Sequence, residues 1–259
     1  MSSHFDALRR LSGQFTDLAR AQADNELSSL SEEVTGLPSK ARPMVSSLWE
    51  ENEYIALKCL HSPFVQGLVQ GTVPSEMHQS YISDDYAFLT AYLKCYEVVL
   101  QHCPEGMPEV KAQIMELMNG ICKEMDIQRD LLESWGLRTD PSASANTYIQ
   151  YLNETSGSPD VSAAEIMIAM VPCARLYAWL GWRLDRACPV HPSPYAHWLD
   201  LYGSEEFWRM ADMMEAVTEK LAEAVPDRLR LSTSYRRAMI LELDFFDAQL
   251  AAAAPPPPP

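Results

Sequence analysis

The stretch AAEIMIAMVPCARLYAWLGWRL, residues 163–184, decides the fold class of this 259-residue chain. Apolar residues occupy nearly every side of its helical repeat, which is typical of a helix buried inside a bundle. Pro172 lies in its middle, where a proline removes an intrahelical hydrogen bond and costs about 3 kcal/mol. Cys173 follows directly, and Tyr177 lies one turn further on the same face. We interpret the segment as a kinked inner helix that presents a thiol and a tyrosine.

The remainder of the chain shows helical periodicity between short breaks rich in proline, glycine, serine and aspartate. No alternating, strand-like run bounded by hairpin turns is found, so the sequence predicts an all-α bundle. Ser75 and Ser232 or Thr233 are the expected N-caps of the second and the last helix. About seven core helices are expected, near residues 44–60, 75–102, 108–134, 143–155, 161–187, 196–224 and 231–251.

The ends of the chain differ in composition from this bundle. Residues 1–43 hold one amphipathic stripe and a turn-rich linker, and we expect a helical appendage there. Residues 44–251 form the predicted helical domain. The closing AAAAPPPPP cannot continue a helix, so residues 252–259 are expected to be an extended, disordered tail.

Composition narrows the classes of partner and compartment. The chain has 36 acidic and 20 basic residues and a formal charge of −16, which disfavours nucleic acid and anionic membrane surfaces. It shows no signal peptide and no apolar run of the roughly 18 residues that span a bilayer. Six cysteines without a CxxC pair indicate reduced thiols. A cytoplasmic protein is expected, with an organelle as the alternative.

Carboxylates on apolar helix faces are candidates for chemistry. Asp85 lies within a stripe of tyrosine and phenylalanine, and Glu242 shares a face with Met239 and Phe246. A glutamate held among apolar groups has a raised pKa and exchanges protons near neutrality. Asp85 and Glu242 have a structural alternative, in which each is a carboxylate paired at a helix edge. The structural alternative for Cys173 is a thiol that packs as a small hydrophobic residue.

Several known kinds of site are missing from the sequence. It contains no phosphate-binding glycine loop, no HExxH and no serine-centred elbow. No histidine has a glutamate three residues before it, as di-iron bundles require, and Cys and His show no zinc spacing. We therefore expect no metal and no cofactor, with any catalysis carried by carboxylates, tyrosines and a thiol.

A set of motifs resembles the TenA family, the thiaminase II enzymes with a haem-oxygenase-like helical fold. The family pattern H-x-F-V-x-G-x-x-x-G-T-L-P, followed by Y-x-x-Q-D-Y-x-Y-L, is recognisable across residues 61–89. The resemblance continues through about residue 250, in order and at similar spacing. It includes YIQYL (148–152), VPCARLY (171–177), YAHWLDLYGSEEF (195–207) and LELDFF (241–246).

This resemblance implies a role for each matching residue. Cys173 is the expected nucleophile, Glu242 the acid/base, Asp85 the clamp on an aminopyrimidine, and Tyr177 the tyrosine one turn beyond the thiol. Pocket tyrosines are expected at Tyr148 and Tyr202. The sequence departs from the pattern at Asp84, where glutamine is usual, and at Phe88, which replaces a pocket tyrosine and retains only its ring.

The implied activity is hydrolysis of 4-amino-5-aminomethyl-2-methylpyrimidine, and of thiamin as a second substrate, to the hydroxymethylpyrimidine in thiamin salvage. A small aminopyrimidine is then the ligand, and the resemblance implies a homo-oligomer, a tetramer. Two alternatives stay open. One is a non-catalytic binder of pyrimidine or thiamin on the same fold. The other is a bundle whose thiol and carboxylates are structural and whose acidic surface serves protein partners.

Overall fold

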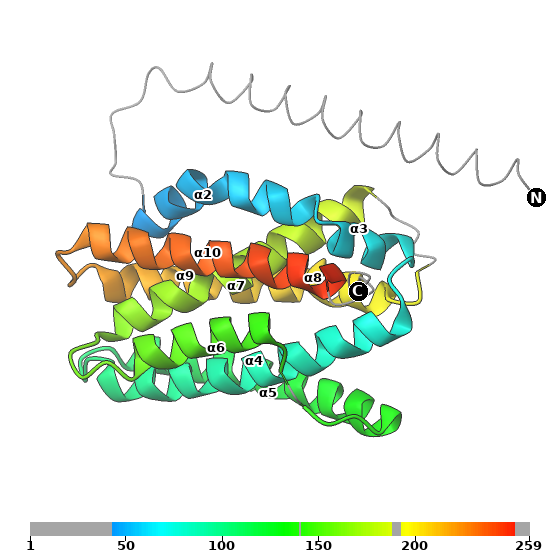
Figure 1. Cartoon of the computed structure of the whole chain (residues 1–259). Coiled ribbons are helices and arrows are strands. Elements are labelled where there is room, and N and C mark those ends of the chain that lie inside the picture. Colours follow the sequence, from blue (N-terminus) through cyan, green and yellow to red (C-terminus); the bar gives the residue numbers. More distant parts are fainter. Residues whose placement is uncertain (1–42, 140, 188–192, 252–259) are drawn as a thin grey trace, which may run out of the picture. The chain divides into compact units, whose positions relative to one another are not determined.

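The computed structural model describes residues 43–139, 141–187 and 193–251. The predicted extension at 1–43, apart from residue 43, and the tail at 252–259 lie outside the described residues. The chain divides into two units, 1–42 and 43–259. Within its described part the second unit holds nine α-helices and no strand (Figure 1). They are α2 (Met44–Leu60), α3 (Pro63–Gln70), α4 (Ser75–His102), α5 (Pro108–Trp135), α6 (Ala143–Ser156), α7 (Ala163–Ala187), α8 (Ala196–Tyr202), α9 (Glu205–Ala222) and α10 (Arg228–Ala251).

The all-α prediction is confirmed, with two corrections to the number of helices. The short helix α3 was not predicted, although Pro63 at its first turn and Gly71 at its end, with φ 67°, are ordinary boundary residues. The single helix expected over residues 196–224 is two helices. It breaks at Gly203, and Ser204 then caps α9 by accepting a hydrogen bond from the backbone N–H of Phe207 at 3.1 Å.

The expected N-caps were also wrong. Ser75 is the first residue of α4 after Pro74, and its side chain makes no capping hydrogen bond. The last helix begins three residues earlier than predicted. Asp227 accepts from the backbone N–H of Arg230 at 3.0 Å, and Thr233 lies inside the helix and donates to the Leu229 carbonyl.

Helix α7 is the core element of the described domain. It packs against α9, α10, α8, α4, α6 and α2, and its buried residues lie along almost its whole length. Figure 1 shows α2, α10, α7 and α9 alongside one another, with α4, α5 and α6 stacked below them. The helix continues through Pro172 without ending. The expectation that no run is apolar and long enough to cross a membrane was wrong for α7, which passes by length and hydropathy. In the structure 89% of that window is buried, as in the core helix of a globular domain.

Polar anchors fix the helices that surround α7. Glu219 on α9 accepts hydrogen bonds from the backbone N–H groups of Met44 and Val45, which satisfies the first turn of α2. Arg175 on α7 binds Asp212 at 2.6 Å and also Glu215, both on α9. These contacts join α2 and α7 to the same helix.

A close approach at Gly181 brings α8 onto α7. A Cβ atom at this position would lie 2.2 Å from the backbone carbon of Tyr202, so only glycine fits here. The contact places Tyr202 beside Tyr177, with ring centroids 4.7 Å apart. A single small residue therefore positions a predicted pocket tyrosine.

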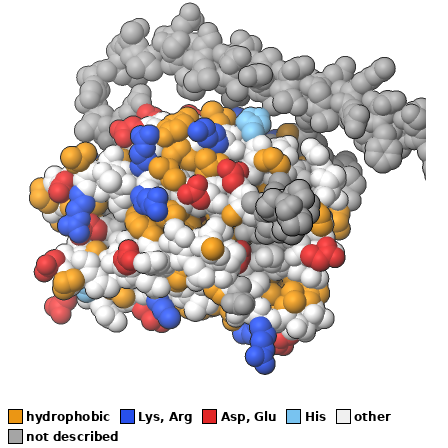
Figure 2. All heavy atoms as spheres, in the orientation of Figure 1, with side chains coloured by type: hydrophobic (Ala, Val, Ile, Leu, Met, Phe, Trp, Pro, Cys, Tyr) orange, Lys and Arg blue, Asp and Glu red, His pale blue; other side chains and the backbone are white. Residues whose placement is uncertain are grey.

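Acidic side chains are not gathered on the face shown in Figure 2. Red side chains are scattered there among blue and orange ones. This face gives no support to the alternative in which a concentrated acidic surface recruits protein partners.

Candidate active site

A cavity opens beside Cys173, between α4, α5, α7, α8 and α9. The cavity volume is about 50 Å³. This is smaller than the ~300–1,000 Å³ typical of small-molecule sites, so the side chains that line it must move to admit a pyrimidine. Four of the predicted site residues line it: Asp85, Cys173, Tyr177 and Tyr202. A bundle with a purely structural thiol would lack such a cavity, so this feature argues against that alternative.

Asp85 is a buried carboxyl group at the cavity wall, with 5% of its surface exposed. Its Oδ2 accepts a hydrogen bond from Gln128 Nε2 on α5 at 2.6 Å. Burial raises the pKa of Asp85 well above its usual range, and the negative charge of Glu124 raises it further. The Gln128 bond opposes these effects. Burial and the neighbouring acid therefore favour the protonated form of this carboxyl group.

Glu242 lies behind Cys173 rather than on the cavity lining and is 2% exposed. Its Oε1 accepts a hydrogen bond from the Tyr148 hydroxyl at 2.9 Å. Burial raises the Glu242 pKa to about 7, while hydrogen bonds from Tyr148 and the Cys173 thiol pull it down. The Cys173 pKa is well above its usual value, first through burial and then through the charge of Glu242. The thiol and the carboxyl group thus shift each other's pKa.

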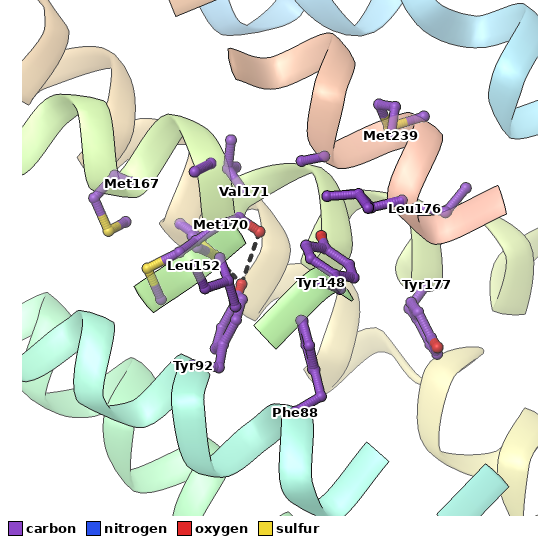
Figure 3. Close-up of a cluster of buried hydrophobic side chains, with 14 of the residues drawn as sticks. Phe88, Tyr92, Tyr148, Leu152, Met167, Met170, Val171, Leu176, Tyr177 and Met239 are labelled. Carbon is purple, nitrogen blue, oxygen red and sulfur yellow. Dashed lines mark hydrogen bonds between the residues drawn. The ribbon is translucent and has the colours of Figure 1, made fainter. Parts of the chain in front are cut away.

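Tyr148 contacts Glu242 of this pair through its hydroxyl, and Phe88 packs on the Tyr148 ring. Figure 3 shows Phe88 extending from α4 toward Tyr148, and their ring centroids are 4.7 Å apart. Both are buried, and neither is among the residues that line the cavity. The dashed line in Figure 3 runs from the Tyr92 hydroxyl to the Met170 carbonyl, which it meets at 2.9 Å. That bond ties α4 to the turn that precedes Pro172.

Tyr177 is held by a chain of hydrogen bonds that comes from α8 and α4. The indole Nε1 of Trp198 donates to the Tyr81 hydroxyl at 3.1 Å, and Tyr81 donates to the Tyr177 hydroxyl at 3.4 Å. The hydrogen-bond partner of the Tyr177 hydroxyl in the described residues is therefore Tyr81 and not the thiol of Cys173. A role for Tyr177 in orienting the thiol stays a prediction.

Sequence reasoning missed two polar residues on α5. Glu124 lines the cavity and accepts a hydrogen bond from Tyr202 Oη at 2.6 Å, and Gln128 binds Asp85. Both continue an apolar stripe that includes Leu117 and Ile121 at a spacing of three to four residues. The test applied to the helices of Asp85 and Glu242, a polar group on an apolar face, would have found them.

Asp84, which stands where the family pattern has glutamine, makes hydrogen bonds that join helices. Its Oδ1 accepts from the backbone N–H of Ser142 at 2.7 Å, and its Oδ2 accepts from Gln249 Nε2 at 3.2 Å. Asp84 thereby joins α4 to the start of α6 and to the end of α10. It is not among the residues that line the cavity.

The chemistry available to this cavity is that of acids, aromatic rings and one thiol. No Lys, Arg or His is among its lining residues. Among the described residues, no group of three or more His, Cys, Asp or Glu side chains is arranged to hold a metal ion. The arrangement suits a flat, nitrogen-rich ligand: carboxyl groups pair with its donors, and rings pack on its faces.

Comparisons with known proteins agree on one family. The model of the TENA/THI-4/PQQC family matches residues 49–252. The bifunctional mitochondrial TH2 protein of Arabidopsis thaliana is 28% identical over 82% of this chain, which spans 38% of that protein's length. An aminopyrimidine aminohydrolase of Halalkalibacterium halodurans is 23% identical, and the match covers 78% of this chain and 93% of that protein.

Solved structures show the same fold. A TenA homologue from P. horikoshii OT3 superposes with a TM-score of 0.71 at 21% identity and covers 81% of this chain and 99% of its own. A Shewanella denitrificans domain of unknown function with a haem-oxygenase-like fold superposes with a TM-score of 0.59 at 13% identity, over 80% of this chain and 92% of its own. The described bundle is therefore haem-oxygenase-like, as its sequence motifs imply.

Proposed function

The chain belongs to the TENA/THI-4/PQQC family, and from that premise we propose that it is an aminopyrimidine aminohydrolase of thiamin salvage. It replaces the amino group of 4-amino-5-aminomethyl-2-methylpyrimidine by hydroxyl, and thiamin is its second substrate. Relatives named aminopyrimidine aminohydrolase support the reaction class.

One observation carries this proposal. The Cys173 thiol lines the same cavity as the Asp85 carboxyl group, and Glu242 lies within hydrogen-bonding reach of the thiol. The proposed nucleophile and the group that pairs with an aminopyrimidine thus line one cavity, and the proposed proton acceptor lies behind the nucleophile.

In the proposed reaction, Asp85 binds the aminopyrimidine and holds its ring beside Cys173. The thiol gives its proton to Glu242, and the thiolate forms a bond to a ring carbon, whose π electrons move to a ring nitrogen. That nitrogen takes the proton from Glu242. The electrons return to expel the leaving group, which departs with the electron pair of its bond to the exocyclic methylene.

Hydrolysis completes the cycle. Water adds to the exposed methylene, and its surplus proton passes to Glu242. The thiolate then leaves the ring with the carbon–sulfur electron pair and regains its proton from Glu242. The ring nitrogen releases the proton that it took earlier to water, which restores the neutral aromatic ring. Water is consumed, and ammonia or thiazole is released with the hydroxymethylpyrimidine. The net reaction needs no oxidant or reductant.

The protonation states at rest agree with these roles. Burial and the nearby carboxyl groups hold the Cys173 pKa high, so the thiol keeps its proton until a substrate is present. The Glu242 pKa of about 7 lets this group take and return a proton near neutrality. Phe88 acts in this scheme through its packing on Tyr148, which in turn binds Glu242.

Assembly and compartment are proposals that rest on the family resemblance. We propose a homotetramer in the cytoplasm, with an organelle as the alternative that the mitochondrial relative supports. Light scattering on the full chain tests the assembly, and a monomer in solution contradicts it.

The activity is tested by incubating the purified protein with 4-amino-5-aminomethyl-2-methylpyrimidine and measuring the hydroxymethylpyrimidine formed. Cys173→Ala is expected to abolish product formation. Cys95→Ala is the matched control, because Cys95 is buried on α4 and does not line the cavity. Unchanged turnover in Cys173→Ala overturns the nucleophile assignment. Tight binding without product in the wild type instead supports the alternative, a non-catalytic binder.

A further inference from the structure

Glu124 is a cavity residue that the reaction above does not use. Its Oε1 accepts a hydrogen bond from the Tyr202 hydroxyl at 2.6 Å. Among the described residues its second oxygen, Oε2, has no hydrogen-bond donor. Both Glu124 and Asp85 line the cavity wall, and each is held by one neutral donor only. The pair therefore presents unshared acceptor oxygens to the space between α4 and α5.

No cation of the described chain balances these acids. The cavity lining contains no basic residue, and neither Asp85 nor Glu124 forms an ion pair with a described Lys or Arg. Next to them, the amide oxygen of Gln128 is buried without a hydrogen-bond donor in the described residues. Asp85 is buried and Glu124 is half-buried, and burial raises the pKa of both. Without a counter-charge they stay neutral, or lose a proton at a cost that a ligand with hydrogen-bond donors and positive charge offsets.

Aromatic rings that line the cavity also suit a ligand with a positive charge. Tyr177, Tyr202 and Phe207 line the cavity together, with centroids 4.7 Å apart for Tyr177 and Tyr202 and 4.9 Å apart for Tyr202 and Phe207. The faces of aromatic rings attract cations, and the effect grows where water is excluded. The carboxyl groups and the aromatic rings of this cavity therefore both favour a cationic ligand group.

We propose that Glu124 is a specificity-determining residue that selects substrates with a cationic group on the exocyclic methylene. The ammonium group of the aminomethylpyrimidine and the thiazolium of thiamin both meet this requirement. Each departs as a neutral molecule, ammonia or thiazole, when it takes the electron pair of the broken bond. The alcohol product carries no cation, so Glu124 favours the substrate over the product. This inference rests on the proposed function.

Two ligands that differ in one group test the inference. The amine 4-amino-5-aminomethyl-2-methylpyrimidine and the corresponding hydroxymethyl alcohol are titrated calorimetrically into the Cys173→Ala protein, which cannot convert them. Glu124→Gln is then added to this background, because glutamine keeps the volume and the acceptor for Tyr202. Glu116→Gln is the matched control, an exposed residue on the same helix.

The parent, which is the Cys173→Ala protein, should bind the amine at least about tenfold more tightly than the alcohol. Adding Glu124→Gln should weaken amine binding by about 10- to 100-fold, whereas alcohol binding should stay within about threefold. Equal affinities of the parent for both ligands overturn the inference even if Glu124→Gln does not fold. Equal effects of Glu124→Gln on both ligands, or no effect on either, also overturn it. If the parent binds neither ligand, the proposed function itself fails and the inference falls with it.

Discussion

Buried charge is handled in opposite ways on the two sides of α7. On the α9 side, Arg175 binds both Glu215 and Asp212, and these bonds more than offset the lowering of the Arg175 pKa by burial. On the cavity side, Asp85 and Glu242 have only neutral hydrogen-bond donors, and burial raises the pKa of each.

The difference separates structure from function. Where the fold uses charge to join helices, the charge is paired within the chain. Where carboxyl groups are buried without a cation, stability is lost, and such groups cluster at functional sites. The contrast predicts that removing a charge destabilises one side and stabilises the other.

The largest expected effect is on catalysis. Glu242→Gln should lower kcat at pH 7 by roughly 10²- to 10⁴-fold, the usual contribution of a general acid–base, because glutamine cannot take the Cys173 proton. Steady-state kinetics with the aminomethylpyrimidine measure it. Asp244→Asn, an exposed change on the same helix, is the control. A kcat within tenfold of the wild type would remove Glu242 from the mechanism.

On the paired side, Arg175→Met should lower the free energy of unfolding by about 3 kcal/mol, near the lower end for a broken buried ion pair. The loss stays at that end because the Asp212 side chain is 53% exposed and regains water. Urea unfolding measures the change, with the exposed Arg186→Met as control. A loss below about 1 kcal/mol would show that the fold does not depend on this pairing.

On the unpaired side, Glu242→Gln should stabilise the protein, increasingly with pH. Because the folded-state pKa is raised from 4.5 to about 7, the stability contributed by the neutral carboxyl group is complete below pH 4.5 and lost as pH rises through 7. Above that range the loss is about 3 kcal/mol, which the variant avoids. Urea unfolding at pH 5 and pH 8 measures the trend. A stability difference that does not change with pH contradicts it.

The smallest effect concerns the partner of Glu242. Tyr148→Phe removes a hydrogen bond to the carboxylate and should raise the Glu242 pKa by about one unit. The acidic limb of the kcat/KM profile should move to higher pH by the same amount. Tyr151→Phe is the matched control, because its hydroxyl binds Ser234 instead. An unshifted limb in Tyr148→Phe would mean that another group sets it.

Much of the fold was predictable from local signals. Proline, glycine and serine mark the breaks correctly, and five of the seven expected helices match within two residues at each end. The helix α3 was missed because eight residues are too few to show a periodic pattern. The break at Gly203 was missed although Gly203 and the capping Ser204 are both local signals for a helix boundary.

The candidate site was predictable to a smaller degree. Position on an apolar face made Asp85 and Glu242 candidates, and the spacing from Cys173 made Tyr177 one. The resemblance added roles for Tyr148 and Tyr202. No pattern showed that Phe88 and Tyr148 support Glu242 from outside the cavity lining, because that depends on how α4, α6 and α10 pack. The apolar-face test would have found Glu124, but its hydrogen bond to Tyr202 depends on how α5 and α8 pack.

The central claim is that the cavity side of α7 keeps a buried carboxyl group without a counter-charge, ready to exchange protons near neutrality. Carbon-13 NMR of the glutamate carboxyl groups, with Glu242 assigned by its loss in Glu242→Gln, measures this directly. The account predicts a titration midpoint near 7 for Glu242 in the unliganded protein. A midpoint near 4.5, the value of an ordinary glutamate, would contradict it.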